Sequence, residues 1–385
     1  MTPADPIAAV THRDPYPYYR MLAQSRPFHY DPALELWVAA GATAVAEVLE
    51  HPAARVRPAA QPVPPALDGS AAGNLFGRLM RMNDGATHAA LKTIVLRRLA
   101  ALDLGVVRIR AHMLASGLPR MTADDANETM RWMFTLPVLT VADVLGLPLE
   151  RDDAGHVSTR VAGFVATFAA AMSPLATPAE VEAGIAAAQW LTRGVESAVG
   201  TAPPGSLLHA LSQDAVPGDI EPATLIANAV GLMIQACEAT AGLIGNTMVS
   251  LGRASAPAND IDALVARVAH LDPPVQNTRR FMSADAVLCG QTVHANDTVL
   301  VLLASAAHDP DDSAGGAGTG RKPWTFGTGR HACPGDALAQ VLAACTVQAL
   351  LARDVHPGRL LHDLRYRPSV NARIPQFSPQ PSSQQ

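Results

Sequence analysis

The residues of this chain that are best placed to do chemistry surround one cysteine, Cys333. It lies in the segment Phe326-Gly-Thr-Gly-Arg-His-Ala-Cys-Pro-Gly335, directly before a long apolar stretch. Pro334 suits the first position of a helix, so Cys333 should lie beside a helix start, where free N–H groups and the helix dipole stabilise a thiolate. The three glycines let the backbone pack closely around a bulky planar group, and Phe326 can cover the sulfur. The pattern therefore indicates a cysteine thiolate that binds a metal.

Two other interpretations of this segment are open. The letters GTGRHA also fit the GxGxxA fingerprint of dinucleotide-binding proteins, but that fingerprint needs a hydrophobic strand before it, and RKPWTF is a poor one. A cysteine beside a glycine turn can also be a buried structural residue, because free cysteine is among the most buried residue types. The remainder of the chain argues against this second alternative.

FGTGRHACPG resembles the haem-binding signature FGxGxHxCxG of the cytochrome P450 superfamily at every fixed position. The resemblance extends from DPYPYYRML near the start to the last helix, and so covers nearly the whole chain. It implies a soluble bacterial-type cytochrome P450 fold with haem b (iron protoporphyrin IX) and Cys333 as the axial ligand. Such a thiolate donates electron density to iron and favours O–O cleavage. The resemblance also implies haem contacts from Phe326, Gly327, His331 and Gly335.

Four residues are implied to hold the haem propionates. His88 and Lys92 lie four apart on an expected helix and resemble the family motif HxxxR, with lysine in place of arginine. Lysine keeps the charge but loses the bidentate fork. Arg280 matches the propionate-binding arginine after the K helix, whereas Arg279 is expected to point elsewhere. His331, two residues before the cysteine, completes a set of donors suited to two carboxylates.

The catalytic candidates Gln235, Glu238 and Thr240 lie on an expected long helix, Pro222–Gly252. The stretch resembles the oxygen-binding motif AGxETT, but Ala239 stands where the family has its usual threonine. A helix turns about 100° per residue, so Thr240 cannot replace a side chain at Ala239 unless the helix bulges. We expect a proton relay through water, Gln235 or a substrate hydroxyl, with Glu238 at its proximal end.

The K-helix motif ExxR of the family is absent. Its two positions are occupied by Arg267 and His270. In the family, this Glu–Arg pair ties the K helix to the meander loop, which here is the short, glycine-rich segment Asp309–Pro323. We expect compensated divergence, with backbone hydrogen bonds, and His270 as a candidate partner, holding the loop.

Segments of helical spacing dominate the chain and predict a mainly α fold with a small β-sheet. We expect one cytochrome P450 domain over residues 1–385, with a disordered tail over 374–385 and loops over Arg57–Gly77 and Asp309–Pro323. The expected helices are Pro17–Ser25, Ala42–Glu50, Ala86–Ala101, Ala126–Leu145, Val161–Met172, Pro178–Val199, Pro222–Gly252, Asp260–Leu271 and Pro334–Leu351. The expected strands are Leu36–Ala39, Ala286–Leu288 and Val299–Leu303.

Composition narrows the classes of function. Hydrophobic residues make up 49% of the chain and charged residues 16%, which favours a large buried core. The net charge of -5 gives no basic field for nucleic acid. The longest apolar run, Val161–Met172, is too short to span a bilayer, and none of the four cysteines forms a CxxC pair. We expect a cytoplasmic protein without a membrane or nucleic-acid partner.

The leading functional expectation is a haem-thiolate monooxygenase. The resemblance implies that one oxygen atom from O2 enters a small hydrophobic organic substrate, with electrons from a ferredoxin- or flavodoxin-type donor. Peroxide-driven oxidation, non-oxygenating chemistry and a haem-binding sensor without turnover are the alternatives. We expect the substrate pocket to be built from four segments, Arg57–Gly77, Val161–Pro178, Leu232–Gln235 and Val275–Thr278.

Overall fold

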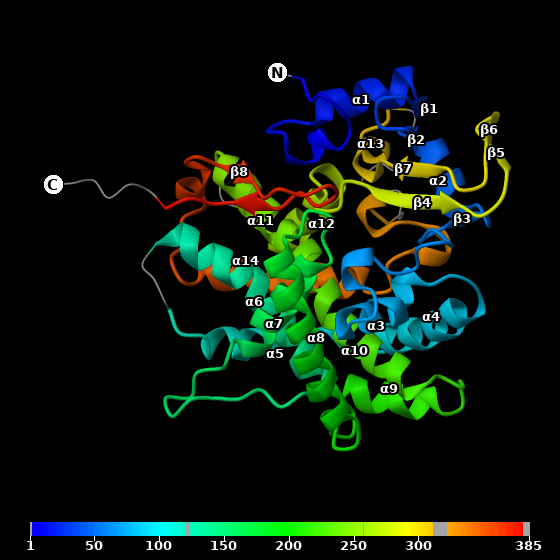
Figure 1. The fold of residues 1–385 in the computed structure, drawn as a ribbon. Helices are drawn as coiled ribbons and strands as arrows, with labels where there is room; N and C mark the ends of the chain where they lie inside the picture. The colour runs from blue at the N-terminus through cyan, green and yellow to red at the C-terminus, as the bar shows by residue number, and fades with distance from the viewer. Residues whose placement is uncertain (1, 121–123, 257, 311–321, 380–385) are drawn as a thin grey trace.

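The structure, a computed structural model, describes residues 2–120, 124–256, 258–310 and 322–379 (Figure 1). Helices predominate in these ranges, and a small sheet accompanies them, which confirms the predicted fold class. The helices are α1 (Tyr16–Ser25), α2 (Ala42–Glu50), α3 (Ala71–Arg78), α4 (Gly85–Ala100), α5 (Leu104–Ser116), α6 (Asp125–Leu145), α7 (Arg160–Ala171), α8 (Pro178–Val199), α9 (Leu207–Ala215), α10 (Pro222–Gln235), α11 (Glu238–Arg253), α12 (Ile261–Leu271), α13 (Leu303–Ala307) and α14 (Asp336–Leu351). The strands are β1 (Phe28–Asp31), β2 (Leu36–Ala39), β3 (Ala54–Arg55), β4 (Thr278–Met282), β5 (Ala286–Leu288), β6 (Gln291–Val293), β7 (Thr298–Val301), β8 (Arg365–Tyr366) and β9 (Pro375–Gln376).

The main sheet has the strand order β1-β2-β7-β4-β3. Strands β2 and β7 run parallel, with Trp37 opposite Val299, and the other pairs are antiparallel. Val299, Leu300 and Val301 are all fully buried, as expected for a strand covered on both faces. Figure 1 shows this sheet with α1, α2 and α13 on one side of the molecule, apart from the larger helical part.

The helical part is built around α6, α10 and α11, which contact one another, and α14, which contacts α6 and α11. Its core includes fully buried Trp132 and Leu139 on α6. Pro222–Arg253, which comprises α10 and α11, is the one helical stretch in the described ranges that is long and apolar enough to cross a membrane, but 72% of its most apolar window is buried inside the protein. It packs as a core helix.

Most predicted helices are present, and the differences have local causes. The predicted loop Arg57–Gly77 ends early because Ser70 caps α3, its side chain accepting a hydrogen bond from the Gly73 N–H. The short helices α5 and α9 and the strands β1 and β4 were not predicted. The predicted helix Pro222–Gly252 is interrupted between α10 and α11.

The prediction of a disordered tail over 374–385 is wrong for residues 374–379. Ile374 and Phe377 are buried, and β9 pairs with β8. Close packing explains the order, because Gly245 of α11 has no side chain and Pro375 lies against it. A Cβ at this glycine would come within 2.8 Å of the proline ring. Residues 380–385 lie outside the described residues.

A buried ion pair joins the C-terminal part of the chain to the end of α12. Arg373, only 1% exposed, lies with its Nε 3.0 Å from an Asp272 carboxylate oxygen. Its Nη1 donates to the carbonyls of Val10 and His12 at 3.1 and 2.6 Å, and its Nη2 donates to the carbonyl of Arg13 at 3.2 Å. The Tyr16 hydroxyl also donates to Asp272. We call this Asp272–Arg373 cluster the N-terminal anchor, because it fastens the first residues of the chain to the core.

The structure places Arg267 on the exposed surface of α12 and His270 half-buried. The helix α12 corresponds to the K helix and has no ExxR pair to hold it. The N-terminal anchor begins with Asp272, the first residue after α12, and can hold this end of the helix. Residues 311–321, most of the expected meander, lie outside the described residues. The proposed role of His270 there stays a prediction.

Candidate functional site

The segment around Cys333 folds as two short 3-10 turns, Trp324–Phe326 and Gly329–His331, before α14. Gly327 and Gly329 both have φ of +66°, a left-handed conformation that glycine adopts without strain. The Cys333 N–H donates to the Phe326 carbonyl at 2.7 Å, which closes the loop. The cysteine side chain is thereby held at one fixed position before the helix.

The loop is fastened to two other elements. The Arg330 guanidinium donates to the carbonyls of His51 and Ala54, which follow α2. The Lys92 ammonium of α4 donates to the carbonyl of Ala332. The predicted propionate ligand Lys92 thus makes its hydrogen bond to the cysteine loop, one residue before Cys333.

Electrostatics at the sulfur differ in part from the sequence prediction. The helix α14 begins at Asp336, so Pro334 precedes the helix instead of occupying its first position. Burial raises the pKa of the Cys333 thiol, while the Gly335 N–H and the charges of Lys92 and Lys322 act in the opposite direction. The chain alone therefore favours the thiol, and a bound metal would convert it to the thiolate, because a coordinating thiol is deprotonated.

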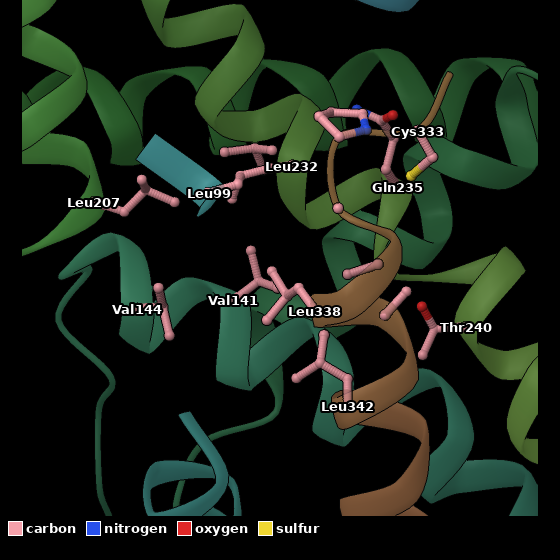
Figure 2. A pocket seen from close by; sticks show the side chains of 14 residues that line it. Leu99, Val141, Val144, Leu207, Leu232, Gln235, Thr240, Cys333, Leu338 and Leu342 are labelled. Atoms are coloured by element: carbon pink, nitrogen blue, oxygen red, sulfur yellow. The ribbon is translucent and has the colours of Figure 1, made fainter. Parts of the chain in front are cut away.

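Cys333 lines a cavity between α10, α11 and α14 (Figure 2). Figure 2 shows Cys333, Gln235 and Thr240 along one side of the cavity, with leucine and valine side chains on the other. The apolar lining consists of Leu99, Val141, Val144, Leu207, Leu232, Leu338 and Leu342, among others. This composition suits an apolar molecule held beside the sulfur.

A break between α10 and α11 brings Thr240 to this cavity. Cys237 has φ -83° and ψ -87°, outside the helical range, and separates Gln235 at the end of α10 from Glu238 at the start of α11. Thr240 is 2% exposed and lines the cavity. The sequence allowed Thr240 to reach the site only if the helix was distorted, and the break supplies that distortion.

Glu238 does not line the cavity, contrary to its expected place at the proximal end of a relay. Its carboxylate lies 3.5 Å from Arg367, and 38% of its side chain is exposed. The reason is again the break, which turns the first residue of α11 outward and the third residue inward. The three catalytic candidates therefore separate, with Gln235 and Thr240 at the cavity and Glu238 in an ion pair outside it.

A second group of polar residues gathers His88, His331 and Arg280 from three segments. The His88 and His331 rings lie 4.2 Å apart between centroids. Nε2 of His331 lies 2.9 Å from an Asp84 carboxylate oxygen. Arg280 is 5% exposed, and its Nε has no hydrogen-bond partner among the residues that the structure describes. We call His88, His331, Arg280 and Asp84 the donor cluster.

Burial governs the charge states in the donor cluster. Burial, followed by repulsion from His331, lowers the pKa of His88 to about 4, and burial lowers the pKa of Arg280 to about 10. Burial alone would raise the pKa of Asp84, but hydrogen bonds from His331 and the Val56 N–H bring it down to about 2. At neutral pH the cluster thus has a neutral His88 and a buried guanidinium that suits an acidic ligand.

Sequence reasoning missed Asp84 and Arg330. Asp84 stands four residues before His88, at the start of α4, and Arg330 occupies a variable position of the cysteine loop. The only sequence signal was an acidic residue directly before a helix, which is ordinarily a cap. Arg279, by contrast, is half-exposed while Arg280 is buried, as the alternation of a strand requires.

Curated relatives cover most of the chain. It is 28% identical to the cytochrome P450 monooxygenase PikC of Streptomyces venezuelae over 90% of this chain and 87% of that protein. It is 25% identical to cytochrome P450 144 of Mycobacterium tuberculosis over 90% of this chain and 84% of that protein. A vitamin D(3) 25-hydroxylase of Pseudonocardia autotrophica is 28% identical over 71% of this chain and 70% of that protein. No model of a protein family matches the chain.

Solved structures share the fold. P450BioI in complex with an acyl carrier protein superposes with a TM-score of 0.72 at 20% identity, covering 94% of this chain and 97% of that one. CalO2 gives a TM-score of 0.71 at 24% identity, covering 98% and 100%. The fold and the cysteine loop define a haem-thiolate protein. The chain is similar to cytochrome P450s over nearly its whole length, and these similarities identify it as an oxidoreductase whose cofactor is haem b.

The described residues fit this cofactor. Cys333 would ligate the iron from the cysteine loop, and the apolar cavity beside it would receive the macrocycle. The buried Nε of Arg280 has no acceptor among the residues that the structure describes, and a haem propionate would supply one. His88 is a second buried polar group that could donate to a propionate.

Proposed function

We propose that this cytochrome P450 is an O2-dependent monooxygenase of apolar organic substrates that receives electrons from a ferredoxin- or flavodoxin-type donor. In this reaction one oxygen atom enters a C–H bond of the substrate, and the other leaves as water after two electrons and two protons are consumed. The observation that carries the proposal is the position of Cys333 at an apolar cavity that also contains the Thr240 hydroxyl. PikC and the vitamin D(3) 25-hydroxylase, named for such activities, support it.

Bound haem with a thiolate ligand supplies the oxygen chemistry. The chain's own side chains have three tasks. Leucine and valine side chains exclude water and bind the apolar substrate. The Thr240 hydroxyl and the Gln235 amide can each hold a water molecule at the cavity, and so move a proton inward. Arg280 and His88 fix the orientation of the cofactor through its carboxylates.

Thr240 replaces Glu238 as the principal proton-handling residue in this proposal, because only Thr240 lies at the cavity. Thr240→Ala should uncouple NADPH consumption from product by at least about tenfold, since a positioned proton donor contributes that much or more. Thr247→Ala is a matched control, because the Thr247 hydroxyl donates to the Leu243 carbonyl within α11.

The test uses holoprotein with ferredoxin, ferredoxin reductase, NADPH and isotopically labelled O2, after candidate substrates are identified by their shift of the haem absorbance. Label from O2 in the product and a drop in coupling only for Thr240→Ala support the proposal. Loss of coupling for Glu238→Ala with intact coupling for Thr240→Ala would refute the assigned role of Thr240.

A peroxide-driven reaction is the second candidate, and one observation favours it. Ala239 lacks the hydroxyl of the family motif, and the Glu238 carboxylate lies outside the cavity, so fewer groups deliver protons to bound O2. Hydrogen peroxide alone would then give product at a rate similar to or above that with NADPH and ferredoxin. Product that requires the electron donor and O2 excludes this candidate.

A further inference from the structure

A second cavity lies against a different face of α10 from the cysteine cavity. It has a volume of about 180 Å³ and is lined by residues 147–150, Ser158, α7 and α8. Leu232 lines the cysteine cavity, whereas its neighbour Met233 lines the second one. The two cavities therefore lie on different faces of the same turn of α10. Figure 1 shows α7, α8 and α10 beside one another, in agreement with their mutual contacts.

The floor of the second cavity is apolar. Leu191, Val195 and Met233 contribute buried side chains, and Trp190 of α8 is partly exposed to the space. This apolar lining is the kind that small-molecule sites have, and the space accommodates a short apolar chain or a single ring. The inner part of the cavity therefore favours an apolar chain or ring.

One cation is fixed at its rim. The Arg160 guanidinium lies 5.2 Å from the Trp190 ring centre and 5.8 Å from that of Phe164, and the two rings are stacked at 4.3 Å. This aromatic support orients the guanidinium and leaves its N–H groups free to bind an anion. Within the described ranges no carboxylate lies at ion-pair distance from Arg160. Glu150, the acidic group of the rim, is exposed and has no comparable support.

Gly194 keeps the mouth of the cavity open. It lies inside the long helix α8, where glycine is unfavourable, and no atom lies within 4 Å of the position a Cβ would take. Packing therefore does not require glycine here. A larger residue at this position would project into the space that a ligand needs.

We propose that the second cavity is a binding site for a small amphipathic carboxylate, whose apolar chain lies on Leu191, Val195 and Met233 and whose carboxylate binds Arg160. This inference goes beyond the proposed reaction and does not depend on it. Met233 and Gln235 belong to the last turn of α10 before the break, so a ligand on Met233 alters the turn that lines the cysteine cavity. Binding in the two cavities is then coupled, and the coupling is reciprocal.

The test is calorimetric titration of decanoate into holoprotein whose haem iron is saturated with 4-phenylimidazole, which blocks the cysteine cavity. We expect one equivalent of decanoate to bind, and 1-decanol to bind at least about tenfold more weakly, because it lacks the charge-assisted hydrogen bond. Gly194→Phe should abolish binding. Gly163→Phe is the matched control, since Gly163 of α7 is also exposed with open space around it but does not line the cavity.

Arg160→Met tests the ligand class, and should weaken decanoate at least about tenfold without weakening decanol. Decanoate should also change the affinity for 4-phenylimidazole several-fold in the wild type and not in Gly194→Phe. No binding to azole-saturated protein, or equal binding by the two glycine variants, would overturn the site. Equal affinity for decanoate and decanol would overturn the carboxylate. None of these readouts requires turnover, so they are separate from the test of the reaction.

Discussion

The cysteine loop and the N-terminal anchor both organise buried polar groups, but only the first preserves the pattern of its family. The cysteine loop keeps each fixed position of FGxGxHxCxG, and its His331 ring lies against that of His88. The K helix has lost its Glu–Arg pair, and the ion pair nearest to its end joins Asp272 to Arg373 of the C-terminal segment. We infer that the anchor does part of the work of the lost pair.

The contrast has a chemical cause. A cofactor requires specific atoms at specific places, so a thiolate or a propionate donor cannot be moved to another segment. A scaffold contact requires only that two elements be held together and that every buried charge be satisfied. Asp272 and Arg373 meet that requirement from new positions, with Tyr16 and the carbonyls of Val10 and His12 completing their hydrogen bonds.

We expect the largest loss of stability when the N-terminal anchor is disrupted. Arg373→Met leaves Asp272 and three backbone carbonyls without their buried partner, and should lower the free energy of unfolding by about 3–5 kcal/mol. Arg365→Met is the control, because Arg365 is 72% exposed in its pair with Asp363 and should cost at most about 1 kcal/mol. Urea denaturation measures both. Similar losses for the two variants would contradict a stabilising role of the anchor.

The donor cluster makes stability depend on pH. The folded state lowers the pKa of His88 from 6.5 to about 4, so the unfolded chain binds this proton more strongly. Stability is then complete above pH 6.5 and falls as the pH drops to about 4, by a total of about 3 kcal/mol for the apoprotein. Asp84, whose pKa is about 2 in the folded state, adds a loss only below about pH 4.

His88→Gln should flatten the slope of unfolding free energy against pH between pH 6.5 and 4. Bound haem should also reduce the slope, because propionates beside His88 favour its protonated form. An unchanged slope in His88→Gln would show that another group titrates.

The two adjacent arginines of β4, Arg279 and Arg280, are expected to differ in their effect on haem retention. Arg280→Met removes a buried donor and should speed haem transfer to apomyoglobin by about 10- to 100-fold, as expected for a hydrogen bond to a charged group. Arg279→Met, on the opposite face of the strand, should change the rate by less than about threefold. Equal effects of the two variants would remove Arg280 from the propionate site.

The smallest expected effect concerns the lost K-helix pair. The double variant Arg267→Glu, His270→Arg restores the family motif, but should change the unfolding free energy by no more than about 0.5 kcal/mol, because Arg267 is exposed and the anchor already fastens the end of α12. Thermal denaturation detects the difference. A large gain in melting temperature would show that the anchor has not compensated for the pair.

Much of the fold could be predicted from periodicity, but its irregular points could not. Long amphipathic or apolar segments such as α8 and α14 were predicted to within a few residues. The break at Cys237 was not, because Ala236, Cys237 and Glu238 carry no proline or glycine that would mark it. The break decides whether Glu238 or Thr240 faces the cavity.

In the candidate site, too, residues at motif positions could be predicted and residues outside the motifs could not. The motif positions predicted that His88, Arg280 and His331 converge. The structure places the rings of His88 and His331 against each other and buries Arg280 within reach of the Asp84 charge. Asp84 and Arg330 were missed because their contacts join segments far apart in the sequence, and neither position carries a motif. The N-terminal anchor was missed for the same reason, since Asp272 and Arg373 are 101 residues apart.

The central claim is that Cys333 is the thiolate ligand of the haem iron, and the spectrum of the reduced carbon-monoxide complex tests it most directly. The wild type should show the red-shifted band of thiolate ligation. Cys333→Ala should lose that band, while Cys345→Ala, which alters a buried cysteine in the core of α14, should keep it. A Cys333→Ala protein that retains the red-shifted band would contradict the assignment.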